Sequence, residues 1–150
     1  MQQISERILL TLWVGGMWIV GPVVTPTLFK MLDDRVLAGT VAGQLFMIMS
    51  FIGLFCGAML LLSHAWSLGG KCLKSWRAWL LMVMLAVIII GEFVISPEIV
   101  SIRDAGMPAE DKARFDLLHR SASTLYMINS LAGLVLVIFG LNSWEQNRID

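Results

Sequence analysis

The segment Ala78–Val100, AWLLMVMLAVIIIGEFVISPEIV, indicates the fold of the chain most clearly. Its first part, Ala78–Gly91, is apolar and carries no charged side chain, which is typical of a helix that crosses a lipid bilayer. Glu92 then interrupts the run, and Ser96-Pro97 follows one turn later. A carboxylate inside a bilayer needs a partner, a proton or a water-filled cavity. The segment therefore predicts a membrane-spanning helix and places the main functional question at Glu92.

The rest of the chain also has the composition of a membrane protein. Of its 150 residues, 57% are hydrophobic and 15% are charged, and the mean hydropathy of +0.78 is too high for a soluble domain of this size. Three further uncharged runs are Ile8–Phe29, Val36–Ser63 and Ser121–Trp144. None alternates polar and apolar residues as a membrane β-barrel does. We predict an all-α fold, a four-helix transmembrane bundle forming one domain over residues 1–150, with helices at about 8–29, 39–63, 77–97 and 121–143.

Several functional classes find no support in the residues. The net charge is zero and there is no basic stripe, so no nucleic-acid partner is expected. The chain shows no nucleophile–base pair, phosphate loop or dinucleotide fingerprint, so an enzyme is disfavoured and no cofactor is expected. Cys56 and Cys72 are not spaced as a metal or redox pair. His64 ends one predicted helix and His119 precedes another, on opposite faces of the membrane, so no metal site is assigned.

An internal repeat links the two halves of the chain. Val23–Leu28 at the end of the first helix matches Val94–Ile99 at the end of the third, and Leu45–Leu54 in the second helix matches Leu125–Leu134 in the fourth. Each pair occupies the same place in its helical hairpin and runs in the same direction. We therefore predict two duplicated hairpins related by a pseudo-twofold axis along the membrane normal.

Small residues and prolines mark the expected helix contacts and kinks. Glycines at GxxxG spacing let helices approach closely, and a proline bends a helix and leaves an upstream carbonyl without its donor. The residues assigned to these roles are Gly15, Gly16, Gly39, Gly43, Gly53, Gly57, Pro26 and Pro97. Residues 107–120 have Pro108 and acids near their start, which predicts a short interfacial helix before the fourth helix or an extramembrane extension of that helix.

Polar residues gather in one leaflet half, on the side of the first and third loops. At 1.5 Å per residue, Glu92 lies about 8 Å from the middle of its helix toward that side. The fourth helix has one polar face at helical spacing, made by His119, Ser123, Tyr126 and Ser130. The candidate functional residues are Glu92, His119, Arg120, Tyr126, Asn129, Gln44, Thr25, Ser96, Ser50 and Ser130.

Two interpretations of these residues stay open. In the first, they line a polar, hydrated cleft around Glu92 that opens to the side of the third loop. In the second, they are structural: Ser, Thr and Asn hold helices together in membranes, and Glu92 pairs with Arg120, His119 or Lys30 at the interface. The methionines, with Met47, Met49, Met82 and Met84 among them, offer thioether contacts to soft metals, but methionine in an apolar helix is more typical of packing.

The charged loops indicate an orientation. The short loop between the second and third helices carries Lys71, Lys74 and Arg77 and no acid, whereas acids interrupt every other basic cluster. The positive-inside rule then predicts that this loop and both termini are cytoplasmic, in a bacterial inner membrane.

Four stretches resemble a known family: Leu12–Phe29 (LWVGGMWIVGPVVTPTLF), Ala38–Phe46 (AGTVAGQLF), Ser96–Ile99 (SPEI) and Phe115–Asn129 (FDLLHRSASTLYMIN). Together they are similar to the DUF4149 or TMEM205-like membrane proteins, and more distantly to copper-resistance D-type and HemJ-type four-helix proteins. The resemblance implies a four-helix membrane protein whose bacterial relatives largely lack an assigned activity and whose animal relatives are connected with resistance to platinum drugs. The positions that match the family pattern are Gly15, Gly16, Pro26, Phe29, Gly39, Gly43, Phe46, Pro97, His119, Arg120 and Asn129. Haem is disfavoured because no histidine lies well inside a predicted helix.

The expected function is that of a non-enzymatic membrane protein of unassigned role, which assists the transport or tolerance of a cation, soft metal or small solute through a polar cleft around Glu92. The alternatives are a haem- or copper-linked redox membrane protein and an accessory subunit of a membrane complex. The expected partners are the lipid bilayer, a second copy in a homodimer, and an unidentified small solute or metal ion.

Overall fold

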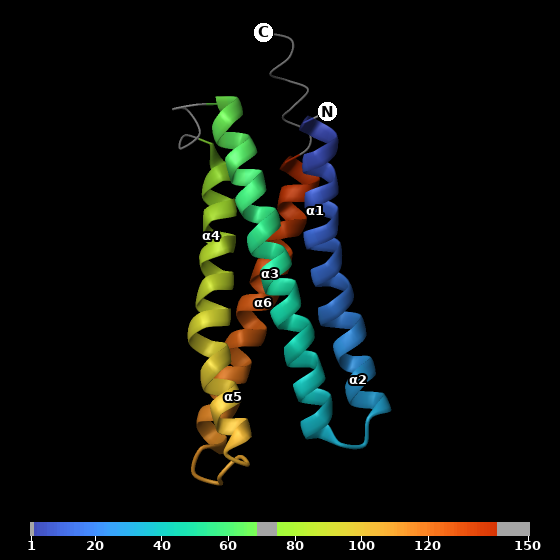
Figure 1. Ribbon diagram of the computed structural model, residues 1–150, viewed down its shortest axis with the longest axis vertical. Coiled ribbons are helices and arrows are strands. Elements are labelled where there is room, and N and C mark those ends of the chain that lie inside the picture. Colours follow the sequence, from blue (N-terminus) through green and yellow to red (C-terminus); the bar gives the residue numbers. More distant parts are fainter. Residues whose placement is uncertain (1, 69–74, 141–150) are drawn as a thin grey trace.

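Four long helical rods form an antiparallel bundle (Figure 1). The structure, a computed structural model, describes residues 2–68 and 75–140, and no strand occurs in this part of the chain. Each rod is long and apolar enough to cross a membrane. The elements are α1 (Gln2–Ile19), η1 (Val20–Val24), α2 (Thr25–Met31), α3 (Arg35–Leu68), α4 (Trp76–Ile90), η3 (Gly91–Ile95), α5 (Ser96–Asp104) and α6 (Lys112–Gly140).

The rods extend beyond the spans expected from the uncharged runs. α3 has 34 residues, which corresponds to about 50 Å of helix against roughly 30 Å of hydrocarbon, so its ends project into the headgroup regions. On the side of the third loop, Lys112–Arg120 is continuous with α6, so the extension of the fourth helix is the alternative that the structure adopts. Residues 141–143 of the predicted fourth span lie outside the described residues, as do residues 69–74 of the basic loop.

The rods contact one another in a ring, α1 with α3, α3 with α4, α4 with α6 and α6 with α1. The core between them is apolar and is centred on Trp13, Met84 and Cys56, which are the largest side chains that are fully buried. The outward surface is also apolar, with large exposed side chains such as Phe55 and Phe139. A continuous apolar exterior is what a lipid-embedded bundle requires and what a protein in water would not tolerate.

The predicted repeat is visible in the backbone. The first and third rods are each interrupted by a five-residue π-helical segment, η1 and η3. Each segment ends immediately before a hydroxyl residue and a proline, Thr25-Pro26 in the first rod and Ser96-Pro97 in the third. Proline has no N–H and disturbs the hydrogen bonds of the preceding turn, so a local change to wider helical bonding is the expected response.

The helix crossings show the same symmetry in their side chains. A Cβ built on Gly53 of α3 would lie 2.6 Å from the indole nitrogen of Trp13 and 2.9 Å from Ile88 Cδ1. A Cβ on Gly133 of α6, the repeat partner of Gly53, would lie 2.9 Å from Val14 Cγ2 and 3.3 Å from both Met17 Cε and Met84 Cε. In the repeat, Trp13 corresponds to Met84 and Met17 corresponds to Ile88. Gly53 contacts Trp13 of the first half and Ile88 of the second, and Gly133 contacts the corresponding residues, Met84 of the second half and Met17 of the first.

The other predicted packing glycines differ in how closely they are approached. Gly16 and Gly57 are tight, with a built Cβ 2.5 Å from Met49 Cε and 2.6 Å from Leu85 Cδ2, respectively. Gly39 and Gly43 have ordinary contacts, and Gly15 has no atom within 4 Å of a built Cβ. The assignment of Gly15 to packing is therefore wrong, because this position of α1 faces away from its neighbours.

These differences predict the effect of adding one methyl group. Alanine at either Gly53 or Gly15 improves helix propensity by roughly 0.5–1 kcal/mol. At Gly53, however, the methyl group collides with the buried Trp13 ring, and overpacking of this kind costs about 1–3 kcal/mol. We expect Gly53→Ala to lower the thermal midpoint in mild detergent, with Gly15→Ala equal to or above the wild type. Equal thermal midpoints for the two variants would contradict the close contact between Gly53 and Trp13 at this helix crossing.

Candidate functional site

Glu92 lies on the face of the third rod that points into the bundle. The buried residues of α4 include Leu81, Met84 and Ile88, and Glu92 continues this stripe at a spacing of four residues in η3. Its side chain is half-buried. A carboxylate thus occupies the interior face of a membrane-spanning rod, at a place where the helical bonding is irregular.

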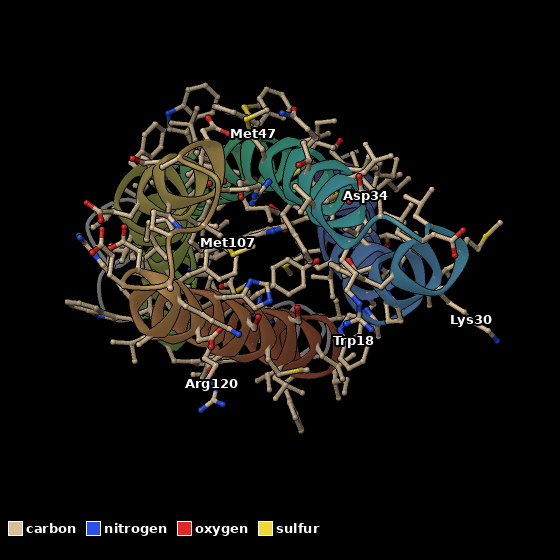
Figure 2. The ribbon with its side chains drawn as sticks, turned by 90° about the horizontal axis from the view of Figure 1, so that it is seen from below. Trp18, Lys30, Asp34, Met47, Met107 and Arg120 are labelled. Atoms are coloured by element: carbon tan, nitrogen blue, oxygen red, sulfur yellow. The ribbon has the colours of Figure 1, made fainter. Side chains whose placement is uncertain are left out.

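No partner compensates this carboxylate. Glu92 makes no hydrogen bond or ion pair with any residue in the described ranges. Figure 2, which looks along the bundle from the end that holds α2 and α5, shows Lys30 and Arg120 pointing away from the bundle. His119 is exposed and stacks on Phe115, with ring centroids 6.0 Å apart. None of the three pairs with Glu92 in the structure, so the pairing that the structural interpretation proposed is not found.

Ser96 adds a second free oxygen one turn further along the same face. It is half-buried and has no hydrogen-bond partner among the described residues. Its repeat partner Thr25 behaves differently, because the Thr25 hydroxyl donates to the Val20 carbonyl oxygen at 2.9 Å. The Thr25 hydroxyl, next to the first π segment, is therefore hydrogen-bonded within its own rod. At the second π segment, the Ser96 hydroxyl and the Glu92 carboxylate have no partner among the described residues.

Tyr126 of α6 explains why the first rod differs. Its hydroxyl donates to the Met17 carbonyl oxygen at 2.8 Å, and its ring lies against Gly21. In a regular helix the Met17 carbonyl accepts the Gly21 N–H, so the tyrosine hydroxyl bonds to the first rod at the turn that ends in Gly21. Its ring also meets Phe46 edge-on, with centroids 4.8 Å apart. The repeat places Gly21 where the second half has Glu92.

Asn129 and Ser130 lie deeper, and each is 4% exposed. The Ser130 hydroxyl donates to the Tyr126 carbonyl oxygen at 2.9 Å, while the Asn129 amide nitrogen reaches only the Met17 sulfur, at 3.9 Å. The Asn129 carbonyl oxygen is buried without a partner in the described residues. A buried amide with one weak contact leaves polar capacity for a further ligand or water.

Three of the predicted cleft residues do not face the interior. Gln44, His119 and Arg120 are exposed. On the predicted face of the fourth helix, which α6 keeps as one continuous helix, His119 and Ser123 at the outer end are exposed, whereas Tyr126 is half-buried and Ser130 buried. Ser50 is half-buried and has no hydrogen-bond partner among the described residues. The interior polar set is therefore Glu92, Ser96, Thr25, Ser50, Tyr126, Asn129 and Ser130.

Two groups of polar residues were not expected. Arg103 of α5 is half-buried, lies against Gly43 and donates to the Thr40 hydroxyl of α3 at 3.3 Å, so it bridges the two hairpins. At the opposite end of the bundle, Glu6 and His64 are buried. The sequence does show charged residues at these helix ends, but hydropathy alone assigns such residues to the loops.

Metal ligands do not assemble in the described part of the chain. His64 lies near the end of α3, and His119 lies near the start of α6, at the other end of the bundle. Residues 2–68 and 75–140 contain no group of three His, Cys, Asp or Glu side chains placed to hold one ion. The free groups at the interior site are oxygen atoms.

The four long apolar helices define the class: a multi-pass membrane protein. The chain belongs to the family described as "Domain of unknown function (DUF4149)", whose profile matches residues 8–108. The match contains the first rod from Ile8 onward, all of the second and third rods and both π segments, whereas α6, with Tyr126 and Asn129, lies beyond it. No curated protein and no solved structure matches the chain.

The contact between Gly21 and Tyr126 yields a prediction. A Cβ on Gly21 would lie 2.7 Å from Tyr126 Cε1, whereas Gly91 of the second π segment has no atom within 4 Å. Gly21→Ala should displace the ring and break its hydrogen bond to Met17, with a loss of about 1–3 kcal/mol of stability. Thermal unfolding in detergent measures this loss, with Gly91→Ala as the matched control. Equal thermal midpoints for Gly21→Ala and Gly91→Ala would refute the contact between Tyr126 and Gly21.

Proposed function

We propose that this protein is a non-enzymatic membrane protein that binds a small hard cation inside the bundle and thereby assists the passage or tolerance of that cation, or of a small solute that moves with it. The observation that carries the proposal is Glu92: half-buried, on the interior face of a membrane-spanning rod, and without a hydrogen bond or ion pair in the described residues. An unpaired carboxylate at such a place needs a water-filled cavity or a bound proton or other cation.

The neighbouring groups favour a hard cation. The Ser96 hydroxyl lies one turn from Glu92 on the same face and is free. Pro97 cannot donate a backbone hydrogen bond, so carbonyl oxygens of η3 are also left without their usual partner. Carboxylate, hydroxyl and carbonyl oxygens are ligands for protons and hard metal ions. In secondary transporters, irregular helices supply carbonyl ligands to coupling ions in the same way.

A soft metal is the less favoured ligand, although TMEM205-like proteins suggest one by resemblance. Thioether sulfur would have to supply the ligands. Met49 packs on Gly16, and Met17 and Met84 pack on Gly133, so these buried methionines fill the space that the glycines leave. The free groups around Glu92 contain no sulfur.

The proposed orientation puts both termini and the basic loop in the cytoplasm of a bacterial inner membrane, with Glu92 nearer the outer side. Cys72 lies in the basic loop by sequence, and Cys56 is fully buried, so a membrane-impermeant maleimide reports on Cys72 alone. We expect labelling in inside-out vesicles and none in intact spheroplasts. Labelling of spheroplasts would reverse the orientation.

Cation flux into proteoliposomes tests the function. Vesicles loaded with a proton-sensitive or a sodium-sensitive dye are given an ion gradient, and the initial rate of the signal is measured. We expect Glu92→Gln to slow the rate by at least roughly tenfold, the factor that corresponds to about 1.4 kcal/mol. Ser96→Ala should slow it less, because a water molecule can replace the hydroxyl.

Glu98→Gln is the matched control, because Glu98 is exposed, lies one turn beyond the interior site and is ion-paired with Arg114. It should keep the wild-type rate. The proposal fails when Glu92→Gln, folded by its thermal midpoint, carries the same flux as Glu98→Gln, or when the wild-type vesicles are no more permeable than empty ones.

A further inference from the structure

A second group of buried polar side chains lies at the other end of the bundle, where α1 begins, α3 ends and α4 begins (Figure 1). Glu6 of α1 is 9% exposed and His64 of α3 is 8% exposed. The Ser63 hydroxyl donates to Glu6 Oε1 at 2.5 Å. Arg77, in the first turn of α4, is half-buried and interacts electrostatically with both Glu6 and His64.

Within this polar cluster, the His64 side chain has a nitrogen without a hydrogen-bond partner. Its Nε2 atom is buried and has no hydrogen-bond partner among the described residues. A buried nitrogen left in this state costs about 1–3 kcal/mol, and a helix in a lipid environment has no bulk water to reduce that cost. A hydrogen-bonding partner at Nε2 would recover this energy.

Among the described residues, two helices bring charged side chains to His64. Glu6 faces it from α1 and Arg77 from α4. The part of α6 that reaches this end, Val135–Phe139, carries no titratable side chain. With Glu6 ionised, Arg77 protonated and His64 neutral, the cluster has no net charge.

We propose that Glu6 and His64 form a buried proton-binding site at this end of the bundle. A hydronium ion gives up one proton, which bonds to His64 Nε2 beside the Glu6 carboxylate, and a water molecule is released. Arg77 keeps its charge throughout, so the cluster passes from zero to one positive charge. Burial disfavours the charged imidazolium most, the guanidinium also repels the proton and the carboxylate attracts it, and the balance of the three sets the pH at which the site is filled.

The same residues do not suit a metal ion. A stable site for zinc or a related ion needs three or four ligands, and no third His, Cys, Asp or Glu joins His64 and Glu6 in residues 2–68 and 75–140. Arg77 also places a fixed positive charge beside the position that an ion would occupy. A proton needs only one acceptor and adds the least charge.

This inference is independent of Glu92, because the two sites lie toward opposite ends of the bundle and share no residue. It goes beyond the proposed function by assigning a proton as the ligand of a site near the termini. A site of this kind would make the packing of α3 against α1 and α4 depend on pH on that side of the membrane.

Nuclear magnetic resonance of the ring carbons tests the proposal directly, because the chain has two histidines. The exposed His119 is the internal control for the buried His64. In detergent micelles, the two titration midpoints should differ in the wild type. We expect Glu6→Gln to move the His64 midpoint to lower pH by about one unit and Arg77→Gln to move it to higher pH, with His119 unchanged in both.

Opposite shifts in the two variants show that Glu6 and Arg77 together set the proton affinity of His64, which burial of the ring alone would not produce. Glu98→Gln, at the far end of the bundle, should leave both histidines unchanged. Should Glu6→Gln fail to fold, the shift in Arg77→Gln decides alone. The proposal is overturned when His64 and His119 titrate together in the wild type, or when the His64 midpoint does not respond in the folded variants.

Discussion

A polar group inside a bilayer must be hydrogen-bonded, protonated or bound to an ion, because no water is present to replace a missing partner. The first hairpin of this protein meets the constraint internally. Thr25 bonds to the backbone of its own π segment, and the Tyr126 hydroxyl bonds to the Met17 carbonyl beside Gly21. The second hairpin does not meet it at Glu92 and Ser96. The proposed function follows from that difference, since the missing partner is what a bound cation would supply.

Duplication makes the difference visible. The two halves share their π segments and the exchanged contacts at Gly53 and Gly133. This symmetric framework keeps the four rods in a ring and brings the interior faces together. The polar groups break the symmetry: Gly21 corresponds to Glu92, and Phe46 corresponds to Tyr126. A duplicated fold in which only one half carries the unpaired oxygens is suited to a ligand that enters from one side.

The fold could be predicted from the sequence because lipid imposes simple rules on it. Uncharged runs of membrane length predicted four helices, and the matching Thr-Pro and Ser-Pro segments predicted the repeat that η1 and η3 display. The direction in which side chains point was harder to predict. In the first and third rods, each π segment adds a residue to its turn and shifts the helical phase. In α3 and α6, nothing in the sequence states which face a neighbouring helix covers. Gln44 and His119 were therefore assigned to the interior although both are exposed. The pairing of Glu6 with Ser63 was missed for a related reason, because it depends on the contact between the ends of α1 and α3.

The central claim is that Glu92 is an uncompensated carboxyl group that binds a proton or a hard cation. Infrared difference spectroscopy on the protein in lipid bilayers measures this most directly, with Glu92→Gln to assign the band. The account predicts a carboxylic-acid band that is absent from the variant and that decreases when the pH is raised or sodium is added. A spectrum that is identical in the wild type and the variant, or a Glu92 band that responds to neither pH nor sodium, would contradict it.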